Sequence, residues 1–249
     1  MAEHFHLKLV DSHMLAPTVR HMVFERDDNK PLALKAGQFV QIHLHYDDGK
    51  PTRRSFSVAS VVAADADTVD KVELAVSYVE GGLATRVLGE LKQGESVEAT
   101  GSFGRFYFFD DDANSRYLLV ATGTGIAPFR ALLPRMAKMM RERGCTFELL
   151  YGVRNPAELL YGDEFEAFAA EHPGFRFHAC LSREMRPEPH PCDHHGHVQD
   201  LLAGLAPDPA HDIAYLCGNP AMVDDTYARL VDAGLSIRYI RREKYVSSR

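Results

Sequence analysis

A glycine-rich run joins a strand-like segment to a helix-like segment near the middle of the chain, and it comprises Gly123, Thr124, Gly125, Ile126, Ala127 and Pro128. Glycines at such a junction let backbone amides approach a phosphate, and the helix start adds partial positive charge. A tight connection that binds nothing would use the same residues. Because the third glycine of G-x-G-x-x-G is missing, the run does not indicate an ordinary Rossmann dehydrogenase. We expect a cofactor pyrophosphate at this turn.

Two shorter motifs in the first half also carry residues suited to cofactor binding. One places a cation, an aromatic ring and hydroxyl groups along a strand: Arg54, Ser55, Phe56 and Ser57. A half-buried strand with a surface arginine would account for it equally well. The other opens a predicted helix with Gly82, Leu83, Ala84 and Thr85. Free N–H groups and a hydroxyl at a helix start suit a phosphate, although simple capping is the alternative.

The elements that must position these motifs differ between the two halves. Short strand-like runs separated by turn residues fill the chain up to about residue 109, and they predict a sandwich or barrel: 18–24, 38–45, 53–58, 71–79 and 96–100. Leucine and valine at helical spacing between Leu83 and Leu91 predict a single helix among them. We interpret the acidic stretch from Asp110 to Ser115 as a linker.

After this stretch, strands and helices alternate, which predicts a parallel sheet covered on both faces. The strands are expected at 116–122, 147–152, 175–181 and 213–218. An amphipathic helix should run from Phe129 to Gly144 with a kink at Pro134, and the last helix should start at the N-cap Asn219 and end at Gly234. The domains are therefore expected at residues 1–110 and 116–249.

Composition excludes several classes of protein. The formal charge of -7 argues against a nucleic-acid binder. The four cysteines have no zinc or iron–sulfur spacing, so we interpret them as reduced thiols. The N-terminus lacks an apolar signal segment, and no apolar stretch is long enough for a membrane span. We expect a cytoplasmic monomer without a membrane partner.

Six motifs together resemble the ferredoxin–NADP reductase family, and within it the bacterial ferredoxin/flavodoxin reductases. They occur in the order found in the family and cover essentially the whole chain: Arg54 to Ser57, Gly82 to Thr85, Gly123 to Pro128, Tyr151 to Arg154, Ser182 to Glu184 and Cys217 to Pro220. The resemblance implies a six-stranded antiparallel FAD-binding barrel with one capping helix, followed by an α/β domain that binds NADP(H).

For FAD, the resemblance implies that Arg54 holds the pyrophosphate, Phe56 lies against the isoalloxazine ring and Ser57 hydrogen-bonds toward flavin N5. Ser55 and the residues from Gly82 to Thr85, with Leu83 and Ala84 between them, complete this set. The family usually has tyrosine at position 56. Ring stacking survives this change, but a hydroxyl hydrogen bond is lost.

For NADPH, the resemblance implies that the run from Gly123 to Pro128 holds the pyrophosphate, while Arg154 and Arg183, with Ser182, bind the 2′-phosphate. Guanidinium groups bind phosphate bidentately and thereby distinguish NADPH from NADH. Each arginine alone would be interpreted as a solvated surface charge. A third family arginine is replaced here by His197, whose mostly neutral ring binds phosphate less firmly.

Hydride transfer is implied at a second group of residues. Cys217, followed by Gly218 and Asn219, would lie beside the nicotinamide, although a buried cysteine is more often plain core packing. Glu243 would lie near flavin N5, and Tyr245 would cover the flavin face that the nicotinamide must reach.

Two clusters are not needed for this scheme. The histidine-rich stretch from His190 to His197, which contains Cys192, is compatible with a metal site, but we interpret it as a solvated loop and expect no metal. Basic residues near the end of an acidic chain form either an exposed strand edge or a docking surface for an acidic carrier: Arg238, Arg241, Arg242 and Lys244.

These observations predict a flavoenzyme that transfers electrons between NADPH and ferredoxin or flavodoxin. The chain carries no cluster motif of its own, so a separate acceptor is expected. An NAD(P)H:flavin reductase or the reductase of an oxygenase system is the alternative within enzymes, although the Ala127-Pro-Phe129 and Cys217-Gly-Asn219 positions favour the carrier reductase. A non-catalytic redox sensor is the alternative outside enzymes.

Overall fold

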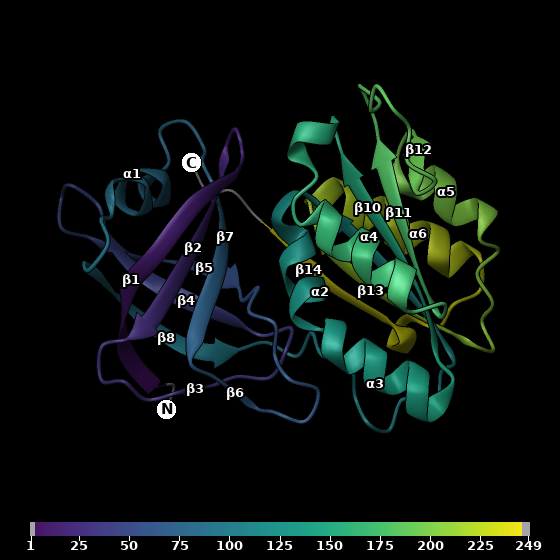
Figure 1. Ribbon diagram of the computed structural model, residues 1–249, viewed down its shortest axis with the longest axis horizontal. Coiled ribbons are helices and arrows are strands. Elements are labelled where there is room, and N and C mark those ends of the chain that lie inside the picture. Colours follow the sequence, from purple (N-terminus) through teal and green to yellow (C-terminus); the bar gives the residue numbers. More distant parts are fainter. Residues whose placement is uncertain (1–2, 246–249) are drawn as a thin grey trace. The chain divides into compact units, whose positions relative to one another are not determined.

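The computed structural model describes residues 3–245, which belong to two compact units (Figure 1). The first unit contains the residues up to Tyr107 together with Ala127–Pro134. The second contains Phe108–Ile126 and, among the described residues, those from Arg135 to Tyr245. No local pattern predicted that a segment from the second half would belong with the first unit.

The first unit is built on a six-stranded antiparallel sheet with the order β5-β4-β8-β1-β2-β7. Its strands are β1 (Glu3–Ala16), β2 (Val19–Arg26), β4 (Phe39–His45), β5 (Pro51–Ser57), β7 (Lys71–Ser77) and β8 (Ser96–Phe103). The short strands β3 (Leu32–Ala33) and β6 (Thr68–Val69) pair separately. A bridge between Val58 and Leu74 joins the two edges of the large sheet, which is thereby curled into a barrel. This confirms the expected antiparallel fold.

The alternation of apolar and polar residues along each strand fills the barrel. In β4, Val40, Ile42 and Leu44 are buried. The strand β1 obeys the same rule, because Phe5, Leu7 and Leu9 are buried while the residues between them point outward. Our expectation omitted β1, although this two-residue period was visible in the sequence. The missed strand is the longest of the sheet, with 14 residues.

The expected helix is α1 (Leu83–Glu90), which inserts Leu83 and Leu88 into the barrel core. The glycine-rich run forms a single 3-10 turn (Gly123–Ile126) and leads into α2 (Ala127–Ala131). The helix is interrupted at Leu132 and resumes as α3 (Leu133–Arg143), which confirms the expected break near Pro134. In α2, Arg130 donates to the carboxylate of Glu73 on β7, and this contact anchors the helix within the first unit.

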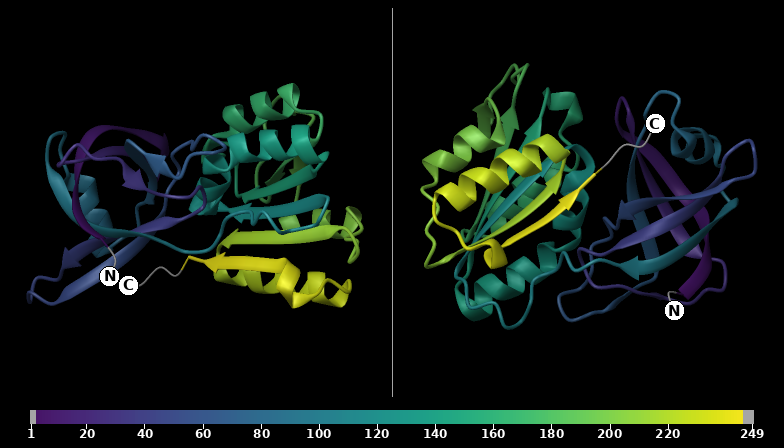
Figure 2. Two further views of the ribbon diagram at one scale, coloured as in Figure 1. Left: turned by 90° about the horizontal axis from the view of Figure 1, so that it is seen from below. Right: turned by 180° about the vertical axis from the view of Figure 1, so that it is seen from behind.

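The second unit is a parallel sheet with the order β12-β11-β10-β9-β13-β14. Its strands are β9 (Arg116–Thr122), β10 (Thr146–Val153), β11 (Phe175–Leu181), β12 (Asp193–His195), β13 (Asp212–Gly218) and β14 (Ile240–Lys244). The helices α3 and α4 (Gly162–Glu171) cover one face, while α5 (Val198–Gly204) and α6 (Pro220–Asp232) cover the other (Figure 2). The expected α/β fold is confirmed. Within residues 3–245, no helix is both long and apolar enough to cross a membrane.

The acidic stretch before β9, which we interpreted as a linker, is held by contacts with the second unit. Asp112 and Asn114 are buried. The carboxylate of Asp112 accepts two hydrogen bonds from the Arg241 guanidinium, at 2.6 and 2.7 Å. The Asn114 amide donates to the carbonyl of Asp212 at 2.9 Å. The charge of Asp112 is thus neutralised by an arginine on β14, far along the sequence.

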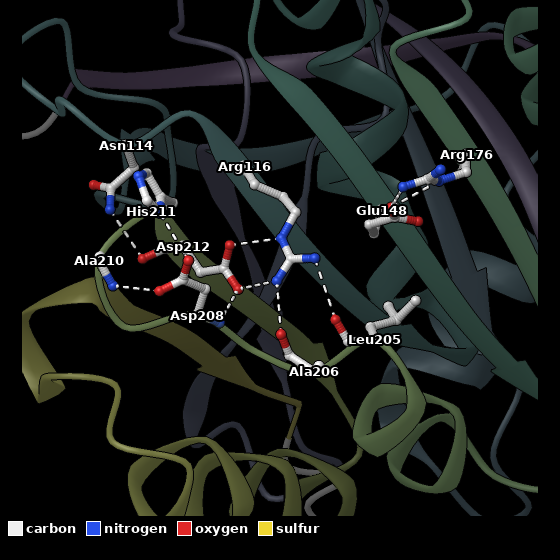
Figure 3. A network of polar contacts seen from close by, with 10 residues as sticks. All are labelled: Asn114, Arg116, Glu148, Arg176, Leu205, Ala206, Asp208, Ala210, His211 and Asp212. Atoms are coloured by element: carbon white, nitrogen blue, oxygen red, sulfur yellow. Dashed lines mark hydrogen bonds and ion pairs between the residues drawn. The ribbon is translucent and has the colours of Figure 1, made fainter.

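A buried ion pair holds the amino ends of β9 and β13 together (Figure 3). Asp212 is fully buried, and its carboxylate accepts two hydrogen bonds of 2.6 Å from Arg116. The same carboxylate accepts the backbone N–H of Asp208 at 2.7 Å. Arg116 also donates to the carbonyls of Leu205 and Ala206. Both carboxylate oxygens of Asp212 and all three guanidinium nitrogens of Arg116 therefore have a partner, as a buried charge requires.

We expect the replacement Arg116→Met to lower the free energy of unfolding by about 3–5 kcal/mol, because it leaves the Asp212 carboxylate buried without its cation. Urea denaturation followed by circular dichroism measures this loss. The matched control is Arg229→Met, since Arg229 pairs with Asp225 while both side chains are about half exposed. The control should cost less than about 1 kcal/mol. Equal losses for the two variants would contradict the assigned role of the buried pair.

Candidate functional site

The carboxyl ends of the parallel strands gather the residues that the sequence assigned to the pyridine nucleotide. Each residue stands within two positions of its strand end, and the order from β12 through β11, β10, β9 and β13 to β14 is His197, Arg183, Arg154, Gly123, Asn219 and Tyr245. Ligands of open α/β sheets bind at this edge, where the strand order reverses. Here the reversal falls between β9 and β13.

Two glycines allow the ends of β9 and β13 to meet at this point. A Cβ atom on Gly125 would lie 2.3 Å from the carbonyl oxygen of Cys217. A Cβ on Gly218, whose φ is +131°, would lie 2.6 Å from the carbonyl oxygen of Thr122. The Thr122 hydroxyl accepts the backbone N–H of Asn219 at 3.0 Å. The two motif loops are therefore one structural unit.

The turn that begins at Gly123 is open where a phosphate would approach. Gly123 has a φ of +55°, and no atom lies within 4 Å of the position that its Cβ would occupy. The hydroxyl of the fully buried Tyr151, on β10, donates to the Gly123 carbonyl at 3.0 Å and thereby holds the turn in place. Open space at a glycine beside a helix start suits a pyrophosphate.

The loop after β13 begins the last helix as expected. The side chain of Asn219 accepts the backbone N–H of Ala221 at 2.9 Å, which confirms the N-cap of α6. Pro220 follows at the first helical position, and Gly234 after the helix has a φ of +95°.

The Arg154 guanidinium lies at the end of β10 and is paired with a carboxylate. Its Nε donates to Glu158 at 2.9 Å, and a second nitrogen donates to the other oxygen. Burial opposes ionisation of Glu158, but the hydrogen bonds from Arg154 outweigh it and lower the pKa of this carboxyl. The arginine keeps just over half of its side chain exposed, at 56%. A phosphate would have to share or displace this partner.

The loop after β11 is fastened to the loop after β10. The backbone N–H of Arg183 donates to the carbonyl of Arg154 at 2.9 Å, and Ser182 donates to the carbonyl of Val153. The structure therefore brings the two arginines onto neighbouring strand ends. His197 lies one strand further, exposed at the N-cap of α5 after Gly196, whose φ of +114° favours glycine.

Cys217, Glu243 and Tyr245 meet at the other side of the reversal. Cys217 lies opposite Glu243 in the pairing of β13 with β14, and the backbone N–H of Tyr245 donates to the Gly218 carbonyl. Burial raises the pKa of the Cys217 thiol far above its ordinary value, although a hydrogen bond with Tyr245 opposes the rise. The sulfur is therefore a neutral thiol at neutral pH and not a reactive thiolate.

The histidine-rich segment is partly folded, since it contains β12. His190, Cys192 and Glu166 of α4 lie close enough to share a metal ion. The Glu166 carboxylate, however, is already bound by the Arg186 guanidinium, which also reaches Asp193. In this cluster, the Arg186 guanidinium therefore provides the positive charge that a metal ion would otherwise provide.

In the first unit, the flavin motif lies on the edge strand β5. Arg54 pairs with Ile42, and Phe56 pairs with Val40. Because both partners are buried in the barrel core, Arg54 and Phe56 share the inner face of the strand. Ser57 is buried but leaves the strand on the opposite face from Phe56. The structure therefore does not place the Phe56 ring and the Ser57 hydroxyl on one face, and Ser55 is exposed.

The β4–β5 hairpin links Arg54 to α1. The Arg54 guanidinium donates to the hydroxyls of Thr52 at 2.8 Å and Tyr46 at 3.2 Å. From α1, the Arg86 guanidinium donates to both carboxylate oxygens of Asp47 in the hairpin turn. Two of the sequence motifs are thus connected through one hairpin.

The start of α1 resembles the turn at Gly123. Gly81 has a φ of +71°, and no atom lies within 4 Å of its missing Cβ. The Thr85 hydroxyl does not cap the helix, because it accepts the backbone N–H of Val79 at 2.7 Å and closes the preceding loop. The first amides of a helix lack partners within the helix. The first unit therefore has an open glycine at the start of α1, and the second unit has one in the turn at Gly123; both suit a pyrophosphate of the kind that FAD and NAD(P)H carry.

Comparisons with known proteins agree with this geometry. Residues 6–108 match the oxidoreductase FAD-binding domain family, and residues 119–227 match the oxidoreductase NAD-binding domain family. Ferredoxin–NADP reductase B of Sorangium cellulosum is 34% identical over 229 residues, which are 89% of each chain. The chain belongs to the ferredoxin–NADP reductase-like family of flavin oxidoreductases.

Other relatives of this oxidoreductase serve different partners. The reductase subunit of an aromatic O-demethylase from Amycolatopsis is 36% identical over 87% of this chain, which corresponds to 62% of that longer subunit. A ferredoxin–NADP+ reductase from Neisseria gonorrhoeae with bound FAD and NADP has a TM-score of 0.82 over 99% of this chain and 100% of that one. At 23% identity, this last likeness concerns the fold.

Three contacts of the candidate site were not anticipated from the sequence, although Tyr151 begins one of the six motifs. Thr122 bonds the Asn219 loop, Tyr151 bonds the Gly123 carbonyl, and Glu158 binds Arg154. For Glu158 a signal existed, since a carboxylate four residues after an arginine commonly forms an ion pair. The other two contacts depend on which strands are neighbours, and no local pattern encodes that.

We expect Gly125→Ala to lower the stability of the fold and to weaken the binding of NADP+. The added Cβ meets backbone atoms that cannot rotate away, so β9 and β13 must separate, at a cost of about 1–3 kcal/mol. Thermal unfolding and the dissociation constant for NADP+ measure the two effects. Gly204→Ala is the matched control, because nothing lies within 4 Å of its missing Cβ. Wild-type NADP+ affinity in Gly125→Ala would refute the role of this contact.

Proposed function

We propose that this FAD-dependent NAD(P)H oxidoreductase is a ferredoxin/flavodoxin–NADP+ reductase. The order of residues along the carboxyl edge of the parallel sheet carries the proposal. Along this edge, an open glycine turn follows β9, one arginine follows β10, another follows β11, and a neutral thiol lies near the end of β13. This is the order of groups along NADPH: pyrophosphate in the middle, 2′-phosphate on one side and nicotinamide on the other.

The spacing of the strands supports this placement. Neighbouring strands lie about 4.8 Å apart, so about 10 Å separate β9 from β11. The adenosine half of the dinucleotide would extend across β10 toward Arg183. The guanidinium groups of Arg154 and Arg183 would then bind the 2′-phosphate, while backbone amides after Gly123 hold the pyrophosphate.

On the first unit, Arg54 and the first amides of α1 would hold the FAD pyrophosphate, since one hairpin connects them. Phe56 would supply an apolar ring. When bound, the flavin accepts two electrons from NADPH and releases them singly to a one-electron carrier. Tyr245 and Glu243 would adjust access to the nicotinamide side, and the buried Cys217 would pack there without charge.

Exposed basic residues would receive an acidic carrier. Arg238, Arg242 and Lys244 are exposed near the edge strand β14. Arg241, which we first grouped with them, is bound to Asp112 and to the Tyr215 hydroxyl and serves the fold. Ferredoxins and flavodoxins are the carriers whose acidic surfaces suit this set.

A second candidate function is the reductase of an oxygenase system, which the likeness to the Amycolatopsis subunit favours. The two functions differ in the acceptor. The FAD-loaded enzyme should reduce a ferredoxin or flavodoxin with NADPH, and it should do so much faster than it reduces free flavin. Absence of flavin absorption, or of its bleaching by NADPH, would overturn both functions. Turnover with an artificial acceptor would exclude a redox sensor.

We expect Arg183→Gln to lower kcat/KM for NADPH by about 10- to 100-fold, because a charge-assisted hydrogen bond contributes about 1.5–3 kcal/mol. The value for NADH should change little, since NADH has no 2′-phosphate. Steady-state kinetics with both nucleotides measures the effect. The matched control is Arg141→Gln, since Arg141 is 70% exposed on α3. A parallel loss with both nucleotides would contradict phosphate recognition by Arg183.

We expect the double variant Arg238→Glu/Arg242→Glu to slow carrier reduction and to weaken its dependence on ionic strength. Reversed charges remove the attraction that steers an acidic carrier. NADPH oxidation with ferricyanide should stay at the wild-type rate. Stopped-flow reduction of the carrier at several salt concentrations provides the measurement. An unchanged salt dependence would show that the carrier docks elsewhere.

A further inference from the structure

Three neighbouring strands of the barrel bring two imidazoles and a carboxylate together on one face. His43 lies on β4, Glu98 on β8 and His4 on β1, and these strands are adjacent in the order β4-β8-β1. Their sequence neighbours Ile42, Val97 and Phe5 are buried in the core. Because side chains alternate along a strand, the three residues share the outer face of the sheet.

The spacing of the side-chain atoms fits a single metal ion. The Nδ1 atoms of His4 and His43 lie 3.2 and 3.3 Å from the same oxygen, Oε1 of Glu98. One ligand atom from each residue can be chosen so that all three lie within 4.8 Å of one another. Tetrahedral ligands about 2.0–2.2 Å from zinc stand about 3.3–3.5 Å apart, which matches these separations.

The more buried imidazole is already oriented by a second contact. Nε2 of His43 lies 3.0 Å from the hydroxyl of Thr100, which is 2% exposed. Metal-binding histidines almost always use their other ring nitrogen in this way, and the contact sets the ring orientation. The side chain of His43 is 13% exposed, whereas those of His4 and Glu98 are 63% and 42% exposed. Solvent can therefore reach the cluster from one side.

We propose that His4, His43 and Glu98 form a binding site for a divalent transition-metal ion of the Zn²⁺ class, separate from the nucleotide and flavin motifs. Two imidazole nitrogens and one carboxylate oxygen suit zinc, nickel, copper or iron(II), with the remaining positions open to water. Magnesium and calcium require oxygen ligands and are disfavoured. The ion would connect β1 to β8 and β4.

Zinc titration of the FAD-loaded full chain, purified without a histidine tag and freed of metal with a chelator, tests this site. Isothermal calorimetry at neutral pH should show one zinc ion bound per chain and no binding of Mg²⁺. The variants His4→Gln and His43→Gln should each weaken zinc binding at least tenfold. His211→Gln is the matched control, because His211 is exposed and also faces a carboxylate, Asp208. Its zinc affinity should equal that of the wild type.

A second measurement separates ligation from damage to the fold. Zinc should raise the melting temperature of the wild type, because an ion that binds only the folded chain stabilises it, and this rise should vanish in His4→Gln.

Thr100→Val keeps the size of the side chain but removes the hydroxyl that orients His43, so it should weaken zinc binding by about tenfold or more. Zinc binding that persists in His4→Gln and His43→Gln, or that is lost instead in Cys192→Ser, would overturn the proposal.

Discussion

The backbones of β9 and β13 approach each other so closely that neither strand end tolerates a side chain at the contact. Gly125 lies against the Cys217 carbonyl, and Gly218 lies against Thr122. This contact joins the two central strands of the sheet where the strand order reverses. The turn at Gly123 and the helix start at Asn219 take their positions from it. The remaining strand ends then follow in sequence on either side.

The amino and carboxyl ends of the same sheet serve different purposes. At the amino end, the Arg116–Asp212 pair is buried and has all its hydrogen bonds, so it holds the strands in register. At the carboxyl end, glycines leave open space, and the Arg154 guanidinium remains half exposed. In this sheet, the charges at the amino end are paired with each other, whereas the carboxyl end can accept an anionic cofactor.

Much of this arrangement was predictable from local patterns. The strand at 116–122, the break near Pro134 and the N-cap at Asn219 agree with the structure because each depends on neighbouring residues. The six motifs also identified the family. The burial of Asp112 before β9 could not be predicted, because Arg241, which neutralises it, lies 129 residues away. That Arg54 and Phe56 face the barrel core follows from their pairing with Ile42 and Val40, which the motif did not reveal.

The ion pair between Arg154 and Glu158 has a consequence for cofactor choice. Glu158 is tethered four residues from the guanidinium, so it competes with an incoming phosphate as an intramolecular anion. Tethered groups act at effective concentrations of about millimolar or higher. A 2′-phosphate gains only the difference between its own affinity and that of the resident carboxylate. Under the proposed function, an internal competitor would therefore grade any preference for NADPH over NADH, and a substitution at Glu158 would change that preference while leaving Arg154 and Arg183 in place.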